Sequence, residues 1–130
     1  MNRAGPFTLL RTLTLCLGLI AASAHSQKAE QTMTKAYIVA EIEVIDAATY
    51  EGYKSAVAPI VSSYGGRYLV RGGQTEAFEG QKPDGRVVIL EFPSMSAAKS
   101  FLNSDEYQPV AAIRQKSTKS RLFVVEGMPQ

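Results

Sequence analysis

Two arginines and one glutamate are the side chains in this sequence best suited to bind or transform a small molecule. Arg67 and Arg71 enclose a short run in the stretch YGGRYLVRGG, residues 64–73. Arginine presents a planar fork that binds carboxylates and other anions bidentately in half-buried sites. Glu91, in RVVILEF, could act as a base if burial without a full partner raised its pKa. The pattern predicts a ligand site containing Arg67, Arg71 and Glu91, with Glu91 as the candidate catalytic residue.

Ion pairing is the competing interpretation of these charges. Arg71 opposite Glu41 or Glu91 on a neighbouring strand would only neutralise charge within a sheet or at an interface. Tyr37 and Tyr107 lie on segments that could approach the same site, where a hydroxyl would orient or donate to a ligand oxygen. Packing alone also accounts for both tyrosines. We include them in the predicted ligand-binding set and leave both interpretations open.

Histidine and cysteine occur only near the N-terminus. Cys16 and His25 are the single residues of their types in the chain. The remainder therefore excludes Ser-His-Asp and Cys-His nucleophilic catalysis, zinc held by the usual nitrogen and sulfur ligands, and haem held by an axial histidine. We expect neither a cofactor nor a metal.

The paired glycines of residues 64–73 do not match a phosphate-binding loop. The stretch lacks Gly-Lys-Ser/Thr, no helix is expected after Gly73, and the glycines are paired rather than spaced as in a dinucleotide fingerprint. Gly65 is typical of a left-handed helix C-cap. Gly72-Gly73 predicts a bulge or bend. We expect these glycines to shape the chain around a pocket.

The N-terminal residues have the pattern of an export signal. Two arginines accompany an apolar run at residues 12–22, and Ala-Ser-Ala at 22–24 matches a small-x-small cleavage sequence. The run is shorter than the roughly 20 residues that span a bilayer. We predict a signal peptide over residues 1–24, cleaved after Ala24, and a periplasmic or secreted protein. The alternatives are an uncleaved N-terminal anchor and a cytoplasmic protein translated from Met33.

Removal of that segment changes the charge balance. The chain has 14 Lys and Arg against 12 Asp and Glu, and two of its arginines lie in the signal. The remainder is neutral, so we expect no binding to nucleic acid and, after cleavage, none to membranes. Residues 25–34 are polar without periodicity, which predicts a disordered linker. One domain is expected over 35–127, followed by a short tail at 128–130.

Hydrophobic periodicity predicts the secondary structure of that domain. Residues 36–44 alternate between an apolar and a mixed face, and apolar residues at spacings of three and four follow the N-cap candidate Asp46. We expect a kink or restart of this helix before Pro59. The remaining expected elements are strands at 67–71, 86–92 and 121–127, an extended segment at 74–80 leading to a turn at 82–85, and a helical region at 96–117 that divides at Ser104.

The order β-α-β-β-α-β predicts a ferredoxin-like α+β fold, with a four-stranded antiparallel sheet and both helices on one face. The other face is left open. By alternation along the strands we place these side chains there: Tyr37, Val39, Glu41, Glu43, Arg67, Arg71, Glu91 and Phe123. Because large exposed apolar patches usually mark interfaces, this half-apolar face predicts a homodimer that packs sheet against sheet.

A series of motifs along residues 35–127 resembles one protein family. The motifs are AYIVAEIEV with Asp46, YGGRYLVRGG, Glu79-Gly80, RVVILEFPS, Asn-Ser-Asp-Glu-Tyr-Gln at 103–108 and Val-Glu-Gly at 125–127. They are similar, in order, to the uncharacterised family called domain of unknown function 1330. The resemblance implies a dimeric α+β barrel, a superfamily that includes cofactor-free monooxygenases, haem-handling enzymes and small stress-related proteins. Family members usually carry an aromatic pair where this chain has Phe101-Leu102.

Three classes of function stay open at this point. The first is a homodimeric protein that binds a small apolar molecule with an anionic end. The second is a cofactor-independent enzyme of the monooxygenase or isomerase type, which would need Glu91 as its base. The third is a purely structural dimer. The feature that separates them is a pocket with unpaired polar groups inside each barrel.

Overall fold

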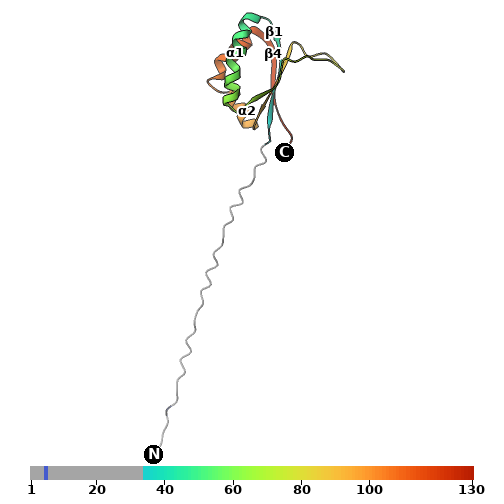
Figure 1. Cartoon of the computed structure of the whole chain (residues 1–130). Helices are drawn as coiled ribbons and strands as arrows, with labels where there is room; N and C mark the ends of the chain where they lie inside the picture. The colour runs from blue at the N-terminus through green and yellow to red at the C-terminus, as the bar shows by residue number, and fades with distance from the viewer. Residues whose placement is uncertain (1–4, 6–33) are drawn as a thin grey trace, which may run out of the picture. The chain divides into compact units, whose positions relative to one another are not determined.

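The computed structural model describes residue 5 and residues 34–130, of which Figure 1 shows the folded part as a coloured ribbon. The predicted signal peptide and most of the predicted linker lie outside the described residues. Residues 34–130 belong to one compact unit.

Four strands and three helices follow one another in a ferredoxin-like order. They are β1 (Ala36–Val44), α1 (Ala47–Ser63), β2 (Arg67–Arg71), β3 (Arg86–Phe92), α2 (Met95–Leu102), α3 (Tyr107–Ser117) and β4 (Thr118–Glu126). The strands form one antiparallel sheet in the order β2-β3-β1-β4, and the helices lie on one side of it (Figure 1). The predicted α+β fold is confirmed.

Helix α1 begins and ends at the predicted signals. The Asp46 carboxylate accepts the Thr49 amide at 3.1 Å and the Thr49 hydroxyl at 2.6 Å, and these bonds lower the pKa of Asp46. Gly65, at φ +77°, terminates the helix. The expected restart before Pro59 is wrong, because α1 continues through it. Pro59 lacks the backbone N–H that would donate one helical hydrogen bond. Packing of the α1 residues Val57 and Val61 in the core stabilises the helix by more than this loss.

The second helical region divides where the sequence predicted. Ser94 accepts the Ala97 amide at 3.0 Å and starts α2. After α2, the Ser104 hydroxyl accepts the Tyr107 amide at 3.1 Å and starts the turn that leads into α3. Strand β4 begins three residues earlier than expected, at Thr118, because it pairs with β1 as far as Val44.

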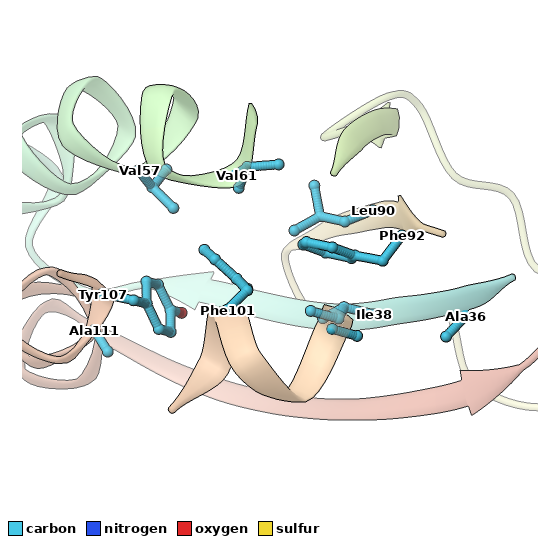
Figure 2. Packing of buried hydrophobic residues seen from close by; sticks show 10 residues of the cluster. Ala36, Ile38, Val57, Val61, Leu90, Phe92, Phe101, Tyr107 and Ala111 are labelled. Carbon is cyan, nitrogen blue, oxygen red and sulfur yellow. The ribbon is translucent and has the colours of Figure 1, made fainter. Parts of the chain in front are cut away.

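The core fills the space between the sheet and the helices. Ile38 of β1, Phe92 of β3 and Phe101 of α2 are almost fully buried, and Figure 2 shows them facing the helix residues Val57 and Val61. The ring of Phe101 lies 5.3 Å from that of Phe92 and 4.4 Å from that of Tyr107. The apolar face of β1 is thus the covered face, as its alternation predicted.

Between β2 and β3 the chain leaves the sheet as an irregular segment, residues 73–84, which we call the arm. Gly72, at φ +74°, and Gly85, at φ +73°, bound it, and no strand or helix is assigned within it. Figure 1 shows the arm projecting on the side of the sheet away from the helices.

Candidate functional site

A cavity lies between the sheet and the helices, at the end of the sheet from which the arm leaves. Its lining is mostly apolar, with four tyrosines, Tyr50, Tyr53, Tyr68 and Tyr107, and three basic residues, Lys54, Arg71 and Arg86. The space that the centres of water molecules can occupy is about 30 Å³, and all empty space, including the part open to solvent, is about 480 Å³. The enclosed space thus holds only a few waters.

A β-bulge brings Arg71 to this cavity. Tyr68 pairs with Leu90, but the next paired residue, Val70, is opposite Ile89, so the register shifts at Leu69. The extra residue reverses the alternation, and Arg71 pairs with Val88, whose side chain packs against the core under the helices. The prediction that Arg71 shares the open face with Arg67 is therefore wrong.

Arg71 and Arg86 lie together at the cavity mouth. Arg71 Nη2 donates to the Lys54 carbonyl at 3.1 Å, and its guanidinium lies 4.5 Å from the centroid of the Tyr68 ring. Arg86 donates from Nη2 to the Arg71 carbonyl at 3.3 Å and from Nη1 to the Tyr50 hydroxyl at 3.4 Å. Neither guanidinium has a carboxylate within 4.0 Å in the described part of the chain. Both therefore keep unused donors beside an apolar cavity.

Glycine at position 72 allows this arrangement. A Cβ atom there would lie 2.5 Å from Nε of Arg86, and the positive φ of Gly72 already disfavours other residues. The prediction of a bend at Gly72-Gly73 is confirmed for Gly72, while the bulge itself lies further back, at Leu69.

Two of the cavity tyrosines, Tyr53 and Tyr68, are held in their neutral form. Burial raises the pKa of Tyr53, with a further contribution from the Tyr107 phenol, while the charge of Arg114 opposes the shift. Burial also raises the pKa of Tyr68, against the effect of Arg71. At neutral pH these phenols are hydrogen-bond donors to a ligand and not bases.

The open face carries the remaining predicted residues, and its charges are paired. Arg67 Nε donates to Glu91 Oε1 at 2.8 Å, and Lys35 lies 3.3 Å from the same oxygen. The hydrogen bond from Arg67 is the main cause of the lowered pKa of Glu91, and the same bond raises the pKa of Arg67. A catalytic base needs a raised pKa, so the Glu91 hypothesis is not supported. Tyr37 pairs with Glu91 across β1 and β3 and lies on this face too.

The structure thus divides the predicted site. Arg71 and Tyr107 line the cavity, whereas Arg67, Glu91 and Tyr37 lie across the sheet from it. Sequence reasoning missed Arg86, although the alternation of β3 contained the signal.

Arg86, Val88 and Leu90 are alternate residues of β3 and therefore share one face of the sheet. The side chains of Val88 and Leu90 pack toward the helices, so Arg86 could have been placed on that face too. Tyr50 and Tyr53 belong to the apolar stripe expected after Asp46, and nothing further in the sequence indicates that they line a cavity. Within residues 34–130 no cluster of His, Cys, Asp and Glu could hold a metal ion, and no helix there has the length and apolarity of a membrane span.

Comparison with known sequences identifies a family. The sequence profile described as "Domain of unknown function (DUF1330)" matches residues 35–128. No curated protein is recognisably similar to the chain in sequence.

Solved structures share the fold. A protein of unknown function from Rhodopseudomonas palustris has 20% identity and a TM-score of 0.62, covering 75% of this chain and 85% of its own. A conserved protein from Bacteroides thetaiotaomicron VPI-5482 has 12% identity and a TM-score of 0.55, covering 72% and 98%. A dimeric ferredoxin-like protein of unknown function from Jannaschia sp. CCS1 has 13% identity and a TM-score of 0.51, covering 70% and 97%. At these identities the likeness concerns the fold alone.

Proposed function

Since this chain belongs to the DUF1330 family of domains of unknown function, its activity has to be inferred from its own geometry, and we propose that it binds a small anionic molecule in the cavity between sheet and helices. One observation carries the proposal. Arg71 and Arg86 lie side by side at the mouth of an apolar cavity, and no carboxylate in residues 34–130 pairs with either.

The positive charge favours an anion as ligand. Neighbouring guanidiniums repel each other, and that repulsion is relieved when a carboxylate or phosphate accepts from both. Arg114 does not line the cavity, but its charge acts on the lining residue Tyr53; it is buried, it donates to the Ser120 hydroxyl at 2.6 Å, and its Nε has no partner in the described region. Lys54 contributes less, because it pairs with Glu51 at 2.6 Å.

The cavity limits the rest of the ligand. Its interior is apolar apart from the phenols and holds only a few waters, so the buried part of the ligand is a short apolar group. The anionic group then lies at the mouth between Arg71 and Arg86, which carry the unused donors. Short aliphatic acids and single-ring aromatic acids meet both requirements.

Catalysis is the less supported alternative. The Bacteroides relative is described as a possible oxidoreductase, and the superfamily includes cofactor-independent monooxygenases. A monooxygenase or isomerase of this type needs a base near the ligand. The cavity lining contains arginine, lysine and tyrosine but no carboxylate or imidazole among the described residues, and Glu91 lies across the sheet. Binding without turnover therefore fits the side chains better.

Homodimerisation through the open face is part of the proposal. Leu69, Phe123 and Val125 are each more than two-fifths exposed on β2 and β4, and an apolar patch on a sheet face favours a partner sheet. The Jannaschia relative of this fold is described as dimeric. We also propose export, with cleavage after Ala24, which mass spectrometry of the N-terminus of the purified protein will test.

A thermal-shift experiment tests the ligand site. Butyrate and benzoate, each with its neutral alcohol as control, are titrated against the parent, Arg71→Met, Arg86→Met and the matched open-face variant Arg67→Met. We expect the acids, and not the alcohols, to stabilise the parent and Arg67→Met. At a hundred times Kd the gain is about 2.7 kcal/mol. Arg71→Met and Arg86→Met should not be stabilised by the acids.

Two outcomes would contradict the proposal. The first is that no acid stabilises the parent. The second is that Arg71→Met and Arg86→Met respond as fully as Arg67→Met, which would make the two arginines structural.

A further inference from the structure

The arm is the most exposed apolar feature of the described chain. Phe78 near its tip is 91% exposed, and no hydrogen bond joins any residue of the arm to the rest of residues 34–130. The arm carries three acidic residues and one basic residue, Glu76, Glu79, Asp84 and Lys82. A large aromatic ring held in water beside negative charges suggests an anchor waiting for a partner.

The open face presents positive charge to the same side. In its ion pairs the cations lie outermost: the side chains of Lys35, Arg67 and Arg121 are 40%, 65% and 70% exposed. The paired carboxylates of Glu91 and Glu41 lie beneath them, 12% and 29% exposed. Lys35 and Arg67 belong to one end of the face and Arg121 to the other. The arm projects on this side of the sheet (Figure 1).

We propose that the arm clasps a second copy of this chain across the open face, with Phe78 as its apolar anchor and Glu76 and Glu79 as counter-charges. This inference rests on the dimer of the proposed function and adds the element that stabilises it. Two-fold symmetry makes the clasp reciprocal, so that each copy gives one arm and receives one.

Electrostatics explains why the partner is a second copy. Two identical faces packed together bring the outward guanidiniums of Arg67 and Arg121 near those of the partner, and like charges at an interface oppose association. Lys35 and Arg67 share the single carboxylate of Glu91, so an acidic arm from each copy would balance the remaining positive charge at that end of the face. A phenylalanine buries about 150–250 Å² when it is fully covered, so two anchors add substantially to an interface of about 1,600 Å².

Tryptophan fluorescence tests the clasp, because the chain contains no tryptophan. The full chain is expressed, and Phe78→Trp is purified as the cell processes it. Its mass is followed by analytical ultracentrifugation over a dilution series together with its emission. We expect the emission to shift to shorter wavelength as the dimer forms and to return to that of an exposed indole on dilution. Gln81→Trp, a polar arm position, is the control and should shift less.

A second pair of variants measures how much Phe78 contributes to the free energy of dimerisation. Phe78→Ser should raise the dimer Kd about 30-fold, the size typical of an aromatic hot spot, while Gln81→Ser should leave it nearly unchanged. Since Phe78 makes no contact within its own core, Phe78→Ser should unfold at the same denaturant concentration as the parent when both are monomeric.

The possible failures are distinguishable. A dimer in which the indole of Phe78→Trp stays exposed, or in which Phe78→Ser associates like the parent, overturns the clasp and leaves the sheet-face dimer standing. A parent that is monomeric at every concentration overturns both. The thermal-shift test of the cavity is independent of these results.

Discussion

On the open face of the sheet, Arg67 lies 2.8 Å from Glu91 and Arg121 lies 2.9 Å from Glu41, whereas on the helix side Arg71 and Arg86 bond only to backbone carbonyls and a phenol. Both faces belong to the same four strands. Their arginines differ in their partners, because Arg67 and Arg121 each have a carboxylate of the same sheet, whereas Arg71 and Arg86 have none among the described residues.

The comparison shows that partner geometry, and not residue type, identifies a binding arginine. Arg67 and Arg71 stand four residues apart and look equivalent in sequence. The bulge at Leu69 sends one to a paired surface and the other to an apolar cavity. The predictions below test this difference between the two faces, from the largest expected effect to the smallest.

The largest difference in unfolding free energy should be between variants of Phe101, in the core, and Phe123, on the open face. Phe101→Ala removes a ring that is 1% exposed and contacts Phe92 and Tyr107, so we expect a loss of about 3–5 kcal/mol in unfolding free energy. Phe123→Ala, on the open face and 44% exposed, should cost less than about 1 kcal/mol in the monomer. Urea denaturation at high dilution measures both. Equal losses would mean that the open face is as well packed as the core.

Gly72→Ala should have an intermediate effect with two readouts. A left-handed backbone costs a non-glycine residue about 1–2 kcal/mol, and the new Cβ would meet the guanidinium of Arg86. We therefore expect lower stability and a smaller thermal shift with benzoate. Gly73→Ala is the matched control, because a Cβ there has nothing within 4 Å. If both variants bind benzoate like the parent, Gly72 does not position Arg86.

Acid should lower the folding stability of the protein by protonating Glu91 on the open face. The hydrogen bond from Arg67 lowers the pKa of Glu91 in the folded state, so its contribution is complete above the unfolded pKa and is lost as pH falls through the folded pKa. We expect the urea midpoint of the parent to fall between about pH 5 and pH 2. In Glu91→Gln the urea midpoint should decline less steeply with falling pH. Glu43→Gln is the control, because Glu43 has no ion pair in the described residues, and its midpoint should decline as in the parent. An unchanged slope in Glu91→Gln would contradict the assignment.

The smallest effect should appear at alkaline pH on the cavity side. Burial raises the pKa of Tyr68 in the folded state, so the folded protein keeps a proton that the unfolded chain loses above about pH 10. Stability from this group is present below that pH and declines above it. Ultraviolet titration should show late ionisation of the Tyr53 and Tyr68 phenols, and Tyr68→Phe should remove one of these two late steps. Early ionisation of every phenol would mean that the cavity is open to water.

Local patterns predicted the elements well because each depends on neighbouring residues. Asp46 caps α1 and Ser104 divides the second helical region because their side chains reach amides three residues away. The alternation in β1 identified the buried face because its residues face one layer of helices along the whole strand. The helix continues through Pro59 without the restart that was one of the two expected outcomes, because long-range packing on the sheet outweighs one local defect.

The sequence by itself determined the fold class, the open and covered faces of β1 and β3, and the absence of histidine and cysteine from residues 35–127. Those properties follow from composition and from periodicities of two and 3.6 residues. Only the tertiary structure decided which arginine is paired. One extra residue in β2 reverses every side chain after it, and pairing requires the strand partner, 24 positions away for Arg67 and Glu91. The cavity at Arg71 and Arg86 exists because distant segments close over it, which no local pattern records.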